Sequence, residues 1–174
     1  TYLDDGVDIN DNYYPDSAMT VTVKGSVNMM SLGTYFLTYC VTDPSNNGPV
    51  CVDRIVIVED NTPPTITFAT DTFVLDVFRP FIIPNYDVSD LYWPLENIIV
   101  THSGSVNTYV TGVYPISFIA TDASGNASAP TTIYIKVVDR VDPGISLKGS
   151  SLVTIERWQP YVEQGYTATD NYNK

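Results

Sequence analysis

The most constraining feature of this sequence is an internal repeat. When the chain is shifted by 79 residues without a gap, residues 2–65 align with residues 81–144. The aligned identities include Gly-Ser-Val-Asn at 25–28 and 104–107 and Thr-Asp at 42–43 and 121–122. Matches at one fixed spacing over such a length mark a tandem repeat. The chain is therefore expected to fold as copies of one unit rather than as one globule.

A third copy begins near the C-terminus. Residues 145–161 align with residues 66–81 with one extra residue, and residues 161–172 align with residues 2–13. The sequence thus predicts repeat 1 at 1–63 without its first strands, a complete repeat 2 at 64–143, and a truncated repeat 3 at 144–174. Since both ends fall inside repeats, we expect the chain to be a window from a longer array.

The hydrophobic pattern predicts an all-β fold. Apolar and other residues alternate along 112–121, the period of a half-buried strand, and the turn-forming run Asp-Ala-Ser-Gly-Asn follows at 122–126. In repeat 2 we expect short strands at 65–69, 73–77, 85–89, 98–103, 106–109, 113–121 and 131–138. Seven such strands are typical of an immunoglobulin-like Greek-key β-sandwich. Tandem copies would be arranged as a rod.

Several motifs carry a family resemblance. They include Gly-Tyr-Thr-Ala-Thr-Asp-Asn-Tyr at 165–172, Ala-Thr-Asp-Ala-Ser-Gly-Asn at 120–126 and Val-Val-Asp at 137–139. Together they resemble the bacterial immunoglobulin-like repeat of the pesticidal-crystal-protein type, which is related to hyalin repeats. The resemblance implies tandem sandwiches on secreted or surface proteins, where such modules serve as spacers, adhesive stalks or enzyme appendages.

A Gly-x-Tyr motif precedes the long strand of two repeats. It occurs at Gly33 and Tyr35 and again at Gly112 and Tyr114. The motif is similar to the tyrosine corner of immunoglobulin-like domains. This resemblance implies that each tyrosine hydroxyl ties a loop.

The two cysteines predict a disulfide. Cys40 and Cys51 lie symmetrically about a turn at 44–47, so they would face each other across a hairpin and point outward. Cross-strand neighbours have Cβ atoms about 4.5 to 5.5 Å apart, which a small adjustment closes. A disulfide implies an oxidising compartment. The alternative is two free thiols, because repeat 2 manages with Ile119 and Pro130 at these positions.

The net charge restricts the partners. Eight Lys and Arg against 20 Asp and Glu give a formal charge of -12, which argues against nucleic acid or an anionic membrane surface. An acidic surface suits cations, or it serves solubility alone. No apolar run approaches the roughly 20 residues that span a bilayer, so we expect no direct membrane insertion. A signal peptide would belong to the longer parent, and the expected location is extracellular, on the cell surface or secreted.

Carboxylates gather where one repeat passes into the next. The connectivity of a sandwich brings the linker close to two loops, and hard oxygen ligands from three segments suit Ca²⁺. The acidic linkers resemble those of cadherins and of giant bacterial adhesins, where calcium rigidifies domain boundaries. The alternative is that Asp and Asn cap turns through their own backbone. The candidate ligands are Glu59, Asp60, Asp87, Asp90, Asp122, Asp139, Asp142 and Asp170.

Aromatic pairs before proline are a second candidate site. They are Tyr13 with Tyr14 and Tyr92 with Trp93. Exposed aromatic faces stack on sugars or anchor a protein partner, so a host or surface glycan or protein is a candidate ligand. The alternative is that they fill the contact between successive domains.

No pattern indicates catalysis. The single histidine, His102, lies on an alternating strand without a serine or cysteine motif near it, and no phosphate loop or zinc spacing occurs. The sequence therefore predicts a non-enzymatic structural segment of an extracellular filament or adhesin stalk, whose partners are neighbouring repeats. The alternative is a glycan- or protein-binding module appended to a secreted protein. A further idea is a filament of copies of the chain, in which residues 145–174 of one copy supply the strands that repeat 1 of the next copy lacks.

Overall fold

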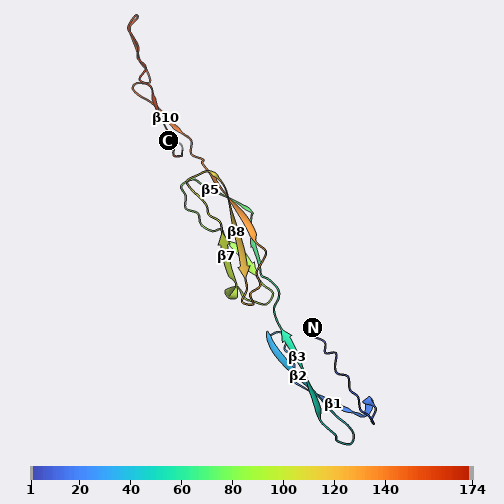
Figure 1. Ribbon diagram of the computed structural model, residues 1–174. Helices are drawn as coiled ribbons and strands as arrows, with labels where there is room; N and C mark the ends of the chain where they lie inside the picture. Colours follow the sequence, from blue (N-terminus) through green and yellow to red (C-terminus); the bar gives the residue numbers. More distant parts are fainter. Residues whose placement is uncertain (1, 173–174) are drawn as a thin grey trace. The chain divides into compact units, whose positions relative to one another are not determined.

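The computed structural model describes residues 2–172 and divides the chain into two compact units, Thr1–Asn61 and Thr62–Lys174. Within the described residues the regular elements are β-strands and two short 3₁₀ turns, without an α-helix (Figure 1). The predicted all-β class is confirmed. The predicted division into three repeats stays a prediction, and each unit is described here by itself.

The first unit is one antiparallel sheet in the order β1-β2-β3 (Figure 1). Its elements are η1 (Asp16–Ala18), β1 (Thr20–Lys24), β2 (Gly33–Thr42) and β3 (Val50–Val58). The central strand β2 buries Leu37 and Tyr39, as its alternating pattern requires. Residues 2–15 form no strand.

The second unit contains a sandwich of two sheets. One has the order β5-β9-β8-β7 and the other pairs β4 with β6. The elements are β4 (Thr65–Phe68), β5 (Thr72–Asp76), β6 (Tyr86–Ser89), η2 (Leu95–Asn97), β7 (Ile99–Ser103), β8 (Gly112–Thr121) and β9 (Thr131–Val138). Ile66 of β4 packs with Phe118 of β8 and Ile133 of β9 in one buried cluster between the sheets. The alternating residues of each strand therefore build the core that the sequence predicted.

One predicted strand is wrong. Residues 106–109 form a loop, because the Asn107 side chain accepts a hydrogen bond from the Tyr109 N–H (3.0 Å). In addition, the Thr108 carbonyl accepts a hydrogen bond from the Phe78 N–H (2.8 Å) instead of pairing with a strand. Val106 still packs against the core, so its apolar character was a correct signal of burial but not of strand structure.

Repeat 3 begins in the same way as repeat 2. Strand β10 (Gly144–Leu147) pairs antiparallel with β11 (Tyr166–Thr169), with Gly144 opposite Thr169. In repeat 2, β4 pairs with β6 in the corresponding register, with Thr65 opposite Ser89. The aligned segments of residues 144–169 and 65–89 therefore pair their strands in the same register.

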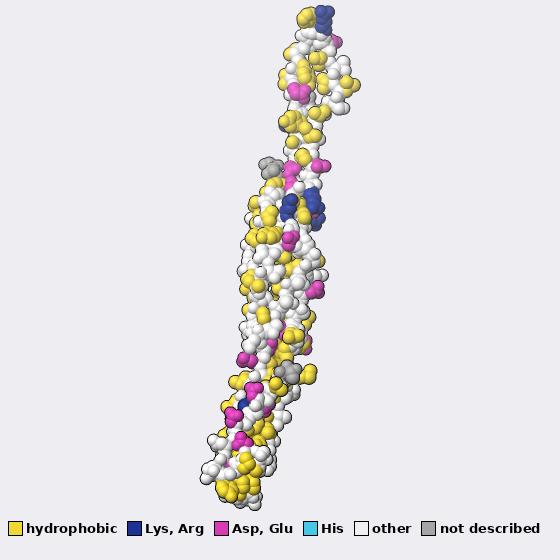
Figure 2. All heavy atoms as spheres, turned by 90° about the vertical axis from the view of Figure 1, so that its right-hand side faces the viewer, with side chains coloured by type: hydrophobic (Ala, Val, Ile, Leu, Met, Phe, Trp, Pro, Cys, Tyr) yellow, Lys and Arg dark blue, Asp and Glu magenta, His cyan; other side chains and the backbone are white. Residues whose placement is uncertain are grey.

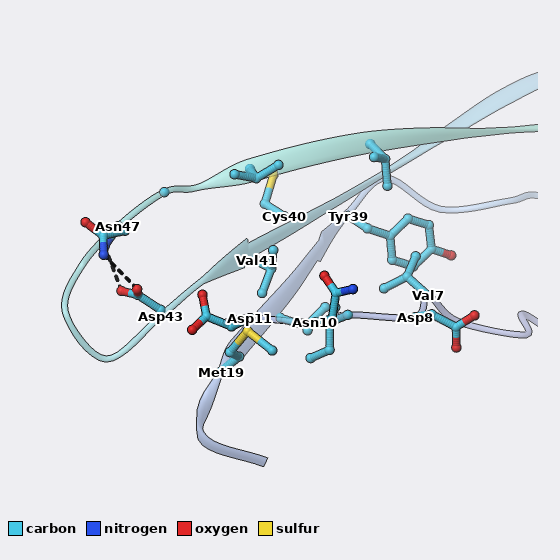
Figure 3. A pocket seen from close by; sticks show the side chains of 15 residues that line it. Val7, Asp8, Asn10, Asp11, Met19, Tyr39, Cys40, Val41, Asp43 and Asn47 are labelled. Carbon is cyan, nitrogen blue, oxygen red and sulfur yellow. Dashed lines mark hydrogen bonds between the residues drawn. The ribbon is translucent and has the colours of Figure 1, made fainter. Parts of the chain in front are cut away.

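The first unit contains a cleft of about 340 Å³ between residues 7–11 and the sheet (Figure 3). In the repeat register, residues 2–61 include no counterpart of β4 or β5, the strands that cover the corresponding residues in repeat 2. Val7, Met19, Tyr39 and Val41 are among the side chains that line the cleft.

A polar network takes the place of core contacts beside this cleft. Arg54 and Tyr39 occupy the positions of Ile133 and Phe118 in repeat 2. The Asp4 carboxylate accepts hydrogen bonds from both the Tyr39 hydroxyl and the Arg54 guanidinium, and Arg54 also donates to the Gly6 carbonyl (2.6 Å). The guanidinium lies 5.3 Å from the centre of the Tyr39 ring, within cation–π range.

The predicted disulfide is confirmed. Cys40 and Cys51 are directly opposite each other on β2 and β3 and are bonded. The expectation that both point into solvent is only half correct, because Cys40 is 8% exposed and Cys51 is exposed. The reason is that Cys40 lies on the central strand, with β1 and β3 on either side.

The Asp4 network predicts a shifted tyrosine titration. The hydrogen bond to Asp4 raises the pKa of Tyr39 to about 12, because ionised Tyr39 would lose that bond and face a carboxylate. Replacing Asp4 by Ala should return the pKa of Tyr39 toward 10, whereas Asp5→Ala should not change it. The measurement is a site-resolved NMR titration of the Tyr39 ring, and a shift that survives Asp4→Ala would contradict the assignment.

The same network makes the first unit sensitive to acid. The Tyr39 hydrogen bond, and then the Gly6 N–H, lower the pKa of Asp4 from its ordinary value of 3.8. A carboxylate with a lowered pKa in the folded state stabilises the fold above pH 3.8, and this contribution is lost as the pH falls further. Asp4→Ala should therefore weaken the acid dependence of unfolding in this range.

Candidate functional site

The hairpin after β8 holds the most buried carboxylate of the second unit. Asp122 is 6% exposed and follows the last residue of β8. Its Oδ1 accepts the Asn126 N–H (2.7 Å) and its Oδ2 accepts the Asn126 side-chain amide (2.9 Å). In repeat 1 Asp43 holds Asn47 through the same two bonds, both 2.8 Å (Figure 3). Both aspartates therefore cap the turn that follows the long strand.

Asp90 lies beside Asp122. Its Oδ1 accepts the backbone N–H groups of Tyr92 and Trp93, each at 2.8 Å. Its Oδ2 is buried and accepts no hydrogen bond from the described residues. A carboxylate oxygen of Asp90 and one of Asp122 lie within 4.8 Å of each other. Two anions this close repel each other in a partly buried setting, which a cation would relieve.

The other ligands predicted for the first junction have different settings. Glu59 accepts a hydrogen bond from the Asn61 side chain (3.0 Å), and Asp60 follows it; both belong to the first unit. Asp87 lies inside β6 and is exposed, on the face opposite the inward residue Val88. The structure therefore does not bring Asp87 to Asp90 and Asp122.

The second junction is built around hydrogen bonds instead. Asp139 Oδ1 accepts the Val141 N–H and the Asn171 side-chain amide, both at 3.2 Å. Asp170 Oδ1 accepts the Tyr172 N–H (2.8 Å), and Asp142 is exposed. In the repeat register, residues 144–172 reach only as far as the counterpart of Tyr92, so they show only part of the pattern seen at Asp90 and Asp122.

The aromatic pairs have the same structure in two repeats. Tyr13 and Tyr14 meet edge to face at 4.9 Å, as do Tyr92 and Trp93 at 5.1 Å. The Tyr14 hydroxyl hydrogen-bonds the Ser45 hydroxyl (2.7 Å), and the Trp93 indole N–H donates to the Ser124 hydroxyl (2.8 Å). The polar ends of Tyr14 and Trp93 therefore attach their loop to the hairpin after the long strand, and their ligand-binding role stays a prediction.

One contact was missed by sequence reasoning. Tyr172 of repeat 3 packs against the core cluster of repeat 2, with its ring centre 6.3 Å from that of Phe78. Its hydroxyl accepts the Thr111 N–H (3.1 Å) and lies 3.3 Å from the Thr111 hydroxyl. Hydrogen bonds from that hydroxyl, and then from the N–H, lower the pKa of Tyr172. We call the site formed by Phe78, Thr111 and the adjoining core cluster of repeat 2 the tyrosine seat.

The loop that presents Thr111 is fixed by the tyrosine corner. Tyr114 donates its hydroxyl hydrogen to the Val110 carbonyl (2.8 Å), and Tyr35 does the same to Ser31 in repeat 1 (2.8 Å). The predicted loop-tying role is confirmed.

Phe78 has φ of 65°, a conformation that is costly for a bulky side chain, and its N–H donates a hydrogen bond to the Thr108 carbonyl. The missed signal was the alignment of Tyr172 with Tyr13 and Tyr92.

Surface charge does not mark a site by itself. On the face that Figure 2 shows, Asp and Glu side chains are scattered rather than gathered in one patch. The part of the chain that the structure describes contains no helix capable of spanning a lipid bilayer.

The sandwich with its tyrosine corner defines an immunoglobulin-like β-protein. Residues 1–58 match the family model described as "Bacterial surface protein, Ig-like domain". The match supports a bacterial surface Ig-like domain in this part of the chain and confirms the resemblance there. No curated protein matched the chain.

Among solved structures, the chain is similar to two crystal forms of human protocadherin-24 EC1-2. The first has 15% identity and a TM-score of 0.43, and covers 71% of this chain and 83% of that one. Form II has 15% identity and a TM-score of 0.41, with 70% and 83% covered. At these values the similarity carries no functional inference.

The tyrosine seat predicts a protected amide. Replacing Tyr172 by Phe removes the oxygen that accepts the Thr111 N–H while keeping the ring. A hydrogen bond contributes about 0.5–1.5 kcal/mol net, so hydrogen exchange at the Thr111 amide should become up to about tenfold faster. The measurement is amide exchange by NMR. Tyr166→Phe, an exposed tyrosine of β11, should leave that rate unchanged, and equal rates in all three proteins would contradict the contact.

Proposed function

We propose that this chain is a non-catalytic segment of an extracellular filament or adhesin stalk, built of tandem Ig-like repeats that extend a distal binding region from a cell surface. The match of residues 1–58 to a bacterial surface Ig-like family supports the location. The observation that carries the proposal is the packing of Tyr172 of repeat 3 into the core cluster of repeat 2. Repeats that pack on their neighbours add length with each copy.

A stalk also requires that each repeat has its own core. In repeat 2, Phe118, Ile133 and Ile135 are almost fully buried within one repeat. Burying such side chains contributes about 1.5–3 kcal/mol each, more than the boundary hydrogen bonds. Each repeat is then stable largely through its own residues. The exposed His102, whose ring meets Phe118 edge to face, has a packing role in this proposal rather than a catalytic one.

The proposal predicts stepwise growth in length. A chain with one more copy of residues 65–143, inserted between Pro143 and Gly144, should gain about one domain length. This is roughly 35 Å, the span of a ten-residue strand such as β8. Small-angle X-ray scattering measures the maximum dimension of both chains. An added copy that collapses onto the others, without an increase in length, would argue against a stalk.

A glycan array separates the stalk from the binding-module alternative. A stalk segment gives no saturable binding, with or without Trp93. A saturable ligand that is lost in Trp93→Ala but kept in Ser124→Ala would favour the binding module. The second variant is the matched control, because it removes the hydrogen bond of Trp93 and keeps its aromatic face.

We also propose that Ca²⁺ stiffens the boundary before repeat 2. Asp90 and Asp122 supply two neighbouring carboxylates, and the buried Oδ2 of Asp90 is an acceptor that fits a cation. Oxygen ligands of this kind suit calcium, which takes six to eight of them, with backbone carbonyls and water supplying the rest.

Calcium binding should raise the melting temperature. At a concentration 100 times Kd, a ligand of the folded state stabilises it by about 2.7 kcal/mol. Asp90→Asn and Asp122→Asn should abolish the difference between calcium and chelator in thermal melts, whereas Asp87→Asn should keep it. Asp43→Asn, which alters the same turn cap in repeat 1, measures the cost of the cap alone. If chelator changes neither melting nor maximum dimension in the unaltered chain, calcium has no role, although the stalk proposal still stands.

A further inference from the structure

Three repeats orient one tyrosine in the same way. In the triplets at 11–13, 90–92 and 170–172, the Asp Oδ1 accepts the N–H of the tyrosine two residues later. The three distances, at Tyr13, Tyr92 and Tyr172, are all 2.8 Å. The middle residue varies, so the shared Asp and Tyr define the motif. The same Asp-capped backbone turn therefore leads into a tyrosine in all three repeats.

Tyr172 contacts the preceding repeat within the second unit. There the ring packs on the core cluster of repeat 2 and the hydroxyl meets Thr111, as described above. Tyr13 has the same local structure, yet it is 81% exposed and its ring meets only its neighbour Tyr14 among the described ring contacts. An exposed aromatic side chain is an effective anchor for a protein surface, because it has few rotatable bonds and loses little side-chain entropy on binding.

The tyrosine seat has a recognisable chemistry. It consists of an aromatic residue with positive φ and, from the loop before Gly-x-Tyr, a backbone N–H that points to the tyrosine hydroxyl. Repeat 3 carries the first half of a seat of its own, since Trp158 aligns with Phe78. Trp158 has φ of 74° and is 83% exposed. An aromatic residue with this unusual backbone therefore recurs at the corresponding place in two repeats.

We propose that Tyr13 is a docking residue, and that its partner is the tyrosine seat of a repeat of the same type on its N-terminal side. The structure indicates this partner, because repeat 2 precedes Tyr172 in the chain and binds its side chain in this way. The contact is made by an aromatic ring and neutral hydrogen bonds to Thr111, so it acts without a cation. It is a mechanical lock between repeats that is separate from the carboxylates of Asp90 and Asp122.

This inference rests on the tandem arrangement proposed above, and its test involves neither calcium nor a glycan. The test uses a lengthened chain in which residues 64–143 and then residues 65–79 precede Thr1. This order keeps the 79-residue register, supplies a complete seat and gives repeat 1 its first two strands. The probe is tetranitromethane, which nitrates accessible tyrosines, with the sites mapped by tandem mass spectrometry.

Nitration of Tyr13 should be at least fivefold slower in the lengthened chain than in the original chain. Tyr166 occurs once in both chains and is exposed, so its nitration rate is the internal reference. Equal rates at Tyr13 in the two chains would overturn the proposal. Protection of Tyr13 in the original chain that increases with protein concentration would also overturn it, because a second copy would then be the partner.

A second lengthened chain tests whether the tyrosine seat itself, rather than the mere presence of an added repeat, protects Tyr13 from nitration. In it, the added copy carries Phe78→Gly, which removes the ring of the seat. Glycine adopts positive φ freely, so the backbone of the added repeat is preserved. Nitration of Tyr13 should return most of the way to its original rate. Unchanged protection would show that the seat is not what covers Tyr13, whereas the stepwise growth in length would be unaffected.

Discussion

The pairing of β8 with β9 is the contact on which repeat 2 depends. It places Ile116 opposite Ile133 and Tyr114 opposite Ile135, so that the inward residues of both strands form one apolar surface. Ile66 of β4 closes that surface from the other sheet. Because every second residue of the hairpin is buried, a slip of one position would expose the whole set. The loops at both ends of the repeat take their positions from this fixed register.

The strands and the disulfide could be predicted because their signals are local. Alternation along 112–121 and the symmetry of Cys40 and Cys51 about one turn depend only on neighbouring residues. Residues 106–109 misled the prediction because Val106 is apolar for a reason unrelated to strand pairing. The Asn107 side chain captures the Tyr109 N–H and makes a turn. A side chain that competes for the backbone is not visible in a hydrophobic pattern.

The candidate site was predicted less completely, since it depends on directions as well as residue types. Asp87 and Asp90 are both acidic and only three residues apart, but strand alternation directs Asp87 away from Asp122. Tyr172 was overlooked because its partner Thr111 lies 61 residues away and has no distinctive sequence signal. Repeat 1 shows the same limit. Arg54 and Tyr39 occupy positions that belong to the core in repeat 2, and both donate hydrogen bonds to Asp4, which lies far from them in the sequence.

One aspartate links the two properties that a repeat boundary needs. Asp90 uses Oδ1 to hold the turn that leads into its aromatic pair, and this leaves Oδ2 as a buried acceptor beside Asp122. In the arrangement that we propose, the turn presents a tyrosine for docking, while the second oxygen offers a place for positive charge. Asp170 makes the same turn at Tyr172, where a neutral contact with Thr111 is already in place. Docking by an aromatic ring therefore requires only the first oxygen, and a cation would add stiffness through the second.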